Sequence, residues 1–336
     1  MAFASHVLLV WAILVILVLI IHVLQITNQP MLLPNENENS NIRKNQRTEF
    51  SNTLVVFQYN WTPTLGVTTE FLAKWKSVFK NIILAIPKPI PKELFSLISE
   101  EIKVLDYQAD NGFVSPLKNL VNVIKQAEDA KFDGILQLHD DMLVNITSIL
   151  RVENWKAKVL TTSSTTGGYT QASNFTLKSG PLTDKWEHWR HDWGLESMKK
   201  SESKIRSYFG TKSSEEILWN TQAQSDFTYL PKTAFDITKH FGKLLAESGV
   251  MIEIAYPKIL QILETQGFDI VGLDLCTNWN RAKRKQVEEM ARLCKLSKNV
   301  KTIDLFHPVK PGLKKMNDAW INWFGKLVSS DVFVDS

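Results

Sequence analysis

The chain has 336 residues, of which 44% are hydrophobic and 22% charged, a globular composition that argues against a disordered or fibrous protein. Its 39 basic and 35 acidic residues give a net charge of +4 without a long block of one sign, which argues against a dedicated nucleic-acid surface. The two cysteines, Cys276 and Cys294, are too few for a disulfide scaffold or a thiolate zinc site. They could form one disulfide in an oxidising compartment.

The first predicted element is a membrane-spanning helix at residues 7–24, an apolar run interrupted only by His22. The run is longer than the roughly 7–15-residue core of a cleaved signal peptide, and no small-x-small cleavage site follows it. An uncleaved signal anchor is therefore favoured over a cleaved signal peptide. It implies a cytosolic tail at residues 1–6 and a single-pass type II protein. The nearest basic residues, Arg43 and Lys44, follow the span, so the positive-inside rule does not support this orientation.

Residues 25–50 are rich in Asn, Glu and Pro without any regular period, which predicts a flexible stem before a folded domain at residues 51–336. In that domain, strand patterns at 52–60, 81–87 and 101–108 alternate with helical patterns at 68–79 and 115–130. Ser115 and Pro116 are typical of an N-cap and a first helical residue. The next strand ends in "ILQLHDDMLV" at residues 135–144. Such alternation predicts an α/β fold with a mostly parallel, Rossmann-like sheet flanked by helices.

The second half of the chain is less regular. We expect strands at 156–162, 226–230 and 268–276, a polar loop at 163–171, and a helix at 251–263 interrupted near Pro257. Trp186, Trp189 and Trp193 form a helical stripe that favours packing on the core over stacking on a sugar. A short strand should present His307, followed by an amphipathic helix at 314–328.

The most unusual feature is the acidic pair Asp140 and Asp141, which follows His139 at the end of a strand that reads as buried. Adjacent carboxylates resist joint ionisation unless a cation or a hydrogen-bond network compensates them. Taken alone, they fit a solvated turn better than a ligand site. Their place at the carboxyl end of a strand in a parallel sheet favours a ligand site. Aspartate oxygens suit Mn²⁺ or Mg²⁺, ions that bridge protein carboxylates to a diphosphate.

Other reactive signatures are missing from the chain or incomplete. There is no GxxxxGK[ST], GxGxxG, GxSxG or HExxH pattern, so nucleoside triphosphatase, dinucleotide-binding and serine-esterase functions lose their best support. The segment "HWRHD" offers His188, His191 and Asp192 at helical spacing, but it lacks the further ligands that a zinc site needs.

An anchor, a stem, and an α/β domain whose fourth strand ends in an acidic motif resemble the layout of Golgi-type glycosyltransferases of the GT-A fold. The resemblance covers residues 52–310. It implies an Asp-x-Asp motif that binds a divalent cation and the donor diphosphate, and a late histidine that completes the metal shell. The matching residues are His139-Asp140-Asp141 and His307, with histidine in place of the first aspartate. By position Asp141, His139 and His307 would hold the metal, and Asp140 would meet ribose or sugar hydroxyls.

Further roles follow from the expected reaction. Inverting transfer needs a carboxylate base for the acceptor hydroxyl, for which Glu253 is the first candidate and Asp226 the second. Each has a structural alternative: a salt bridge at a helix edge for Glu253 and a turn before a strand for Asp226. Lys310 could meet the diphosphate or simply be solvated. The resemblance to the GT-A fold further implies that Tyr59 and Asn60, at the end of the first strand, would face the nucleobase.

The sequence therefore predicts an Mn²⁺- or Mg²⁺-dependent glycosyltransferase in the Golgi or ER lumen. It would move a sugar from a nucleotide sugar, with a UDP-sugar favoured, to a glycan or protein acceptor. The alternative, motivated by His139, is a membrane-anchored protein that kept the fold but lost catalysis and serves as a binding or scaffold subunit. Three N-glycosylation sequons occur, at Asn60, Asn145 and Asn174, of which Asn174 lies in the most loop-like context.

Overall fold

The structure is a computed structural model that describes residues 47–59, 72–73, 75–90, 92–97, 99–108, 114–162, 164–165, 168–169, 194, 196–209, 226–277 and 305–307. All of these belong to the second of two compact units, Asn41–Ser336. No helix in these ranges is long and apolar enough to cross a membrane, and the predicted span at 7–24 lies outside them. The predicted helices at 186–193 and 314–328 also lie outside the described residues.

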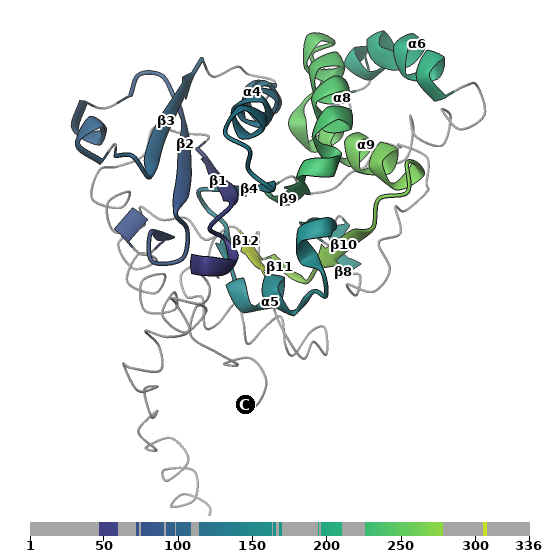
Figure 1. The fold of residues 1–336 in the computed structure, drawn as a ribbon. Coiled ribbons are helices and arrows are strands. Elements are labelled where there is room, and N and C mark those ends of the chain that lie inside the picture. The colour runs from purple at the N-terminus through teal and green to yellow at the C-terminus, as the bar shows by residue number, and fades with distance from the viewer. Residues whose placement is uncertain are drawn as a thin grey trace, which may run out of the picture. The chain divides into compact units, whose positions relative to one another are not determined.

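A seven-stranded sheet forms the centre of the domain, with the order β10-β6-β9-β4-β1-β2-β3 (Figure 1). Its strands are β1 (Thr53–Gln58), β2 (Asn81–Pro87), β3 (Ile102–Tyr107), β4 (Gly134–His139), β6 (Val159–Thr162), β9 (Phe227–Pro231) and β10 (Ile270–Leu273). Strand β9 runs antiparallel to both of its neighbours, and every other pairing is parallel. The predicted α/β architecture with a mostly parallel sheet is confirmed.

The order of the strands reverses between β1 and β4. From β1 the chain continues to β2 and β3 on one side, whereas β4 adds to the other side of β1. In open α/β sheets, ligands bind beyond the carboxyl ends of the two strands at such a switch point. The last residues of β1 and β4, Gln58 and His139, are partners in the parallel register. The sheet therefore brings the strand before the acidic pair next to the end of the first strand.

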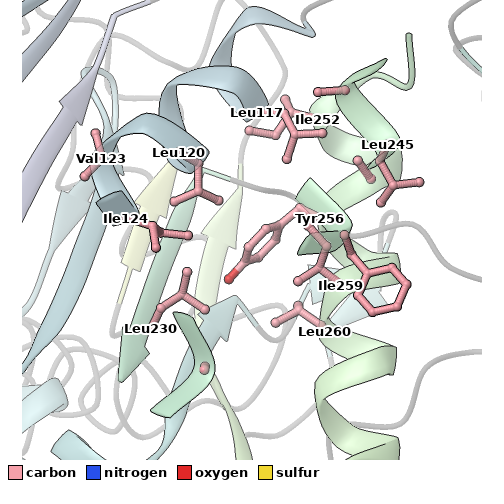
Figure 2. Close-up of a cluster of buried hydrophobic side chains, with 14 of the residues drawn as sticks. Leu117, Leu120, Val123, Ile124, Leu230, Leu245, Ile252, Tyr256, Ile259 and Leu260 are labelled. Atoms are coloured by element: carbon pink, nitrogen blue, oxygen red, sulfur yellow. The ribbon is translucent and has the colours of Figure 1, made fainter. Parts of the chain in front are cut away.

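Three helices cover one face of the sheet: α4 (Ser115–Asp129), α8 (Phe235–Glu247) and α9 (Ile252–Thr265) (Figure 1). Figure 2 shows the apolar cluster between them, in which Tyr256 of α9 lies among Ile124 of α4, Leu230 of β9 and other aliphatic side chains. Each such large side chain, once buried, contributes about 1.5–3 kcal/mol to stability. Gly242 lets α8 approach α4, because a Cβ there would lie 2.9 Å from Cγ2 of Val121.

The first turns of α4 and α9 lie at the carboxyl edge of the sheet. Helix α4 follows the carboxyl end of β3. Helix α9 ends just before β10, a strand that runs parallel to β6, and it packs on α8 and α4. Helix α9 therefore directs its N-terminus, which carries partial positive charge, toward the same edge as the ends of β1 and β4.

The other face of the sheet packs against aromatic side chains. Phe57 of β1 contacts Trp75, which stacks on Phe79 with ring centroids 5.1 Å apart. Phe50 is fully buried in the same cluster, so packing begins before residue 51, within the segment predicted as stem. The sheet β11 (Leu275–Thr277), β12 (Leu305–His307) and β5 (Leu143–Val144) contributes Leu305 to this cluster.

The remaining described elements are short or peripheral. They are the 3-10 helices η1 (Lys92–Leu97), η2 (Trp155–Ala157) and η5 (Lys232–Ala234), the helices α5 (Ile146–Arg151) and α6 (Ser197–Phe209), and the strands β7 (Ser164–Thr165) and β8 (Gly168–Tyr169).

Two local predictions about helices are wrong. Ser115 is the first residue of α4, not its N-cap, and its hydroxyl donates to the carbonyl of Gln108 at 2.7 Å. Helix α9 continues through Pro257 without interruption. A proline inside a helix costs about 3 kcal/mol. Here that cost is offset because the side chains from Ile254 through Leu263 are all buried.

Candidate functional site

The acidic pair forms a turn directly beyond β4. The backbone amide of Asp140 donates to the carbonyl of Gln58 at 3.1 Å, and that of Met142 donates to the carbonyl of His139 at 3.1 Å. Asp140 and Asp141 are partly exposed, whereas Met142 is buried. The backbone of this turn is therefore fixed to the end of β1, and its two acidic residues are partly exposed at the switch point of the sheet. We call residues Asp140 and Asp141 the acidic turn.

His139 and Asp226 form a buried pair at the same edge. Nδ1 of His139 lies 3.0 Å from Oδ1 of Asp226, and both side chains are 5% exposed. The backbone amide of His139 also donates to the carbonyl of Asp226 at 2.9 Å. The antiparallel direction of β9 explains this contact, because the residue before β9 lies beside the last residue of β4. Asp226 is thus placed to orient His139.

The acids around His139 determine its charge. Burial lowers the pKa of its imidazole, but the charge and hydrogen bond of Asp226 outweigh this effect, and Asp141 and Asp140 raise the pKa further, to about 9. At neutral pH His139 is therefore an imidazolium and supplies a cation to the acidic turn. Its Nε2 is buried, with no hydrogen-bond partner among the described residues. A metal-ligand role for His139 would use Nε2 after loss of its proton.

A second buried polar group lies at the ends of β1 and β3. Nε2 of Gln58 donates to the hydroxyl of Tyr107 at 2.9 Å and to the carbonyl of Tyr59 at 3.1 Å, and the Tyr107 hydroxyl also donates to that carbonyl. Nδ2 of Asn119, on α4, donates to Oε1 of Gln58 at 3.3 Å. We call Gln58, the Tyr59 carbonyl, Tyr107 and Asn119 the edge network.

Sequence reasoning missed three members of this network, Gln58, Tyr107 and Asn119. A signal was present for two of them. Gln58 is a polar residue in the otherwise apolar strand "TLVVFQ", and Asn119 falls on the buried face of α4. Buried amides require hydrogen-bond partners, so such positions indicate a polar network. Tyr107 gave no such signal, because a tyrosine at the end of a strand is common.

The strand that carries His307 returns to the acidic turn. Strand β12 pairs antiparallel with β5, with Leu305 opposite Val144 and Phe306 opposite Leu143. Continuing this register places His307 at the level of Met142, the residue after Asp141. Among the side chains that the structure describes, no three His, Cys, Asp or Glu residues are grouped as metal ligands would be, and the side chain of His307 lies outside that set.

The other predicted site residues have varied positions. Glu253 is partly exposed in the first turn of α9, between the buried Ile252 and Ile254. Tyr59 directs its side chain into the apolar cluster on the face away from α4, so its carbonyl, not its ring, joins the edge network. Asn60 and Lys310 lie outside the described residues.

One sequon is explained by the structure. Asn145 is buried, and its Oδ1 accepts a hydrogen bond from the Thr147 amide at 3.1 Å as the N-cap of α5. This side chain is therefore occupied within the fold, as its place beside a predicted strand indicated. Asn60, Asn174 and Cys294 lie outside the described ranges.

Comparison with known proteins assigns no family to the chain. No protein-family profile matches the sequence, and no curated protein matches it. Among solved structures, mannose-1-phosphate geranyltransferase from Thermus thermophilus is similar over 66% of this chain and 73% of that chain. The two share 11% sequence identity, and the TM-score is 0.32.

Proposed function

We propose that the chain is a metal-dependent glycosyltransferase that moves a sugar from a nucleotide-diphosphate sugar, with a UDP-sugar as the favoured donor, to a glycan or protein acceptor. One observation carries the proposal. Strand β12 returns from the far end of the described chain to pair with β5, so that the backbone of His307 lies beside the acidic turn at the switch point. Acidic and imidazole ligands at the ligand-binding edge of a parallel sheet are suited to a divalent cation and a diphosphate.

The residues at this edge fit Mn²⁺ or Mg²⁺. Asp141 is partly exposed, and β12 brings the backbone of His307 to the same edge. A carboxylate and an imidazole from these two residues would suit either ion. A bound cation would neutralise the charge that develops on the departing diphosphate. Asp140, whose amide is fixed by Gln58, would receive ribose or sugar hydroxyls. The Nδ1 atom of His139 is paired with Asp226, which holds the residue beside the acidic turn. His139 would therefore coordinate a metal ion only through Nε2.

The remaining roles are assigned to residues at the same edge or beyond the described ranges. Glu253, at the N-terminus of α9, would accept the proton of the acceptor hydroxyl if the reaction inverts the sugar. Lys310 would meet the diphosphate, and Tyr59 and Asn60 would border the nucleobase. The anchor at residues 7–24 would hold the domain in the lumen of the Golgi or ER.

The test is Mn²⁺-dependent binding of UDP to the full-length protein, measured by titration calorimetry. Wild type should bind UDP more tightly with Mn²⁺ than with a chelator, and Asp141→Ala should lose this difference. The matched control is Asp236→Ala, because the Asp236 side chain is 90% exposed on α8. Equal affinity with and without Mn²⁺ in wild type would refute the metal-dependent site.

The alternative function is separated by a second measurement on the same samples. A transferase should also hydrolyse a UDP-sugar slowly in the presence of Mn²⁺, with water replacing the acceptor. Mn²⁺-dependent binding without hydrolysis or transfer to any glycan acceptor would favour the binding or scaffold subunit, for which the replacement of the first aspartate by His139 is the specific support.

A further inference from the structure

Gln58, the last residue of β1, and the adjacent Tyr59 are held by hydrogen bonds from several elements. The Tyr59 amide donates to the carbonyl of Ala85 at 2.9 Å, and the Tyr59 carbonyl accepts from both Gln58 Nε2 and the Tyr107 hydroxyl. The Gln58 carbonyl accepts from the amide of Asp140 at 3.1 Å. The backbone polar groups at this end of the strand therefore have partners within the protein, and the edge is held in one conformation.

Tyr107 reaches this point from two strands away. It ends β3, and β2 lies between β3 and β1. In the register of β1 and β2, Gln58 is paired with Ala85, which has no side-chain atoms beyond Cβ. Tyr107 is paired with Pro87, two residues further along β2, and its hydroxyl still meets Gln58 and Tyr59. The tyrosine is only 9% exposed.

A polar network at this position is not required by the fold. Strands β1 and β2 are mostly apolar, and a buried amide costs stability unless its hydrogen bonds are made. Gln58 is fully buried and obtains its partners from the adjacent residue Tyr59, from β3 and from α4. A satisfied network of this kind makes the adjacent surface rigid, which suits the edge where a ligand binds.

We propose that Tyr107 is a positioning residue for the nucleoside half of the donor site. This inference rests on the proposed function. Through the Tyr59 carbonyl and Gln58, Tyr107 fixes the end of β1 against which the base and ribose of a nucleoside diphosphate bind. The acidic turn shares one backbone contact with the edge network, the Asp140 amide on the Gln58 carbonyl, but its side-chain support comes from the His139–Asp226 pair. The two halves of one ligand therefore depend on two different sets of buried side-chain hydrogen bonds.

The experiment compares two probes, UDP and inorganic diphosphate, each with Mn²⁺ and the full-length protein. Tyr107→Phe removes one hydroxyl and keeps the ring. It should raise the dissociation constant of UDP about fivefold, as expected for the loss of a buried hydrogen bond, and leave that of diphosphate unchanged. The matched control is Tyr229→Phe, because the Tyr229 hydroxyl donates to the Lys156 carbonyl at 3.3 Å, away from this edge. That variant should bind both probes as wild type does.

Asn119→Ala is the second variant, in case Tyr107→Phe does not fold. It removes the donor to Gln58 from α4 and should weaken UDP binding about twofold, again without an effect on diphosphate. Unchanged UDP affinity in the folded variants, or an equal loss for both probes, would overturn the positioning role. A wild type that binds diphosphate but not UDP would overturn it too and leave the metal site standing. Binding of neither probe would overturn the proposed function and this inference together.

Discussion

Two buried basic residues, His139 at the carboxyl edge of the sheet and Lys258 in helix α9, have pKa values that are shifted in opposite directions. His139 is 4% exposed, and the surrounding carboxylates raise its pKa to about 9. Lys258 is fully buried, and burial alone lowers its pKa well below the ordinary value of 10.5. Its Nζ has no hydrogen-bond partner within the part of the chain that the structure describes. Burial by itself therefore does not identify a functional cation. What distinguishes the two sites is the presence of acidic partners.

The surroundings account for this difference. Helix α9 is buried on nearly all sides, so the stem of Lys258 packs as an apolar side chain within it. His139 lies instead where strand ends, a turn and the start of β9 bring three carboxylates together. The protonated form of His139 is therefore favoured at the sheet edge, whereas the protonated form of Lys258 is disfavoured in the helix layer. The following predictions test this contrast, beginning with the largest effect.

Removal of the acidic partner should be the most damaging change. In Asp226→Ala, the buried His139 loses the carboxylate at 3.0 Å, and breaking a buried pair in this way costs about 3–5 kcal/mol. Urea unfolding of the full-length protein measures the loss. The control Asp236→Ala removes a carboxylate that is 90% exposed, so its free energy of unfolding should change by less than about 0.5 kcal/mol. Similar stabilities for the two variants would contradict a supporting role for the pair.

The pH dependence of stability should reveal the charge on His139. Its folded pKa, about 9, lies above the unfolded value of 6.5, so the folded state binds more protons in this range. The contribution, roughly 3 kcal/mol, is complete below pH 6.5 and is lost as the pH rises through 9. Unfolding measured from pH 6 to 10 with a chelator should show this decline. His139→Gln should remove it, and an unchanged slope in that variant would show that another group titrates.

The charge on Lys258 should change the free energy of unfolding with pH in the direction opposite to that of His139. Its folded pKa is lowered, so below pH 10.5 the unfolded state binds more protons and the wild type loses stability as the pH falls toward the folded pKa. Lys258→Met keeps the stem and removes the amine, and it should stabilise the protein by about 1–2 kcal/mol at neutral pH. The gain should shrink as the pH approaches 10.5. Lys243→Met, a change on the exposed face of α8, should have little effect. A destabilised Lys258→Met would indicate that the amine has a function.

The strands were the most predictable part of the fold. The run "NIILAIP" predicts a strand at 81–87, and β2 spans Asn81–Pro87. Length, β-branched residues and flanking polar residues determine such an element locally. The reversed direction of β9 could not be predicted, because an apolar run carries no information about which neighbours it will pair with. The helix break predicted at Pro257 is wrong for a related reason. The burial of the whole helix outweighs the local preference of one residue.

The residue types of the candidate site could be identified from the sequence, but the contacts between them could not. His139 and Asp226 each stood out in the sequence, yet their pairing depends on the antiparallel register of β4 and β9. The approach of His307 to the acidic turn likewise depends on strand pairing between distant segments. Tyr107 could not be identified at all, because its contacts with Gln58 and Tyr59 arise only once β2 has paired with both β1 and β3.

The smallest predicted effect concerns a buried polar residue without charge at the same sheet edge. Asn145 caps α5 through the Thr147 amide, and N-cap removal costs about 1 kcal/mol, so Asn145→Ala should lower the free energy of unfolding by that amount. The loss should not vary between pH 6 and 10, unlike that of His139→Gln, because no proton is involved. Glycosidase treatment should give the same band shift for wild type and Asn145→Ala, since the side chain is buried. A glycan on Asn145 would show that its side chain becomes accessible during maturation. The sheet edge beside the acidic turn would then not be fixed, and the contrast with the buried helix layer would be contradicted.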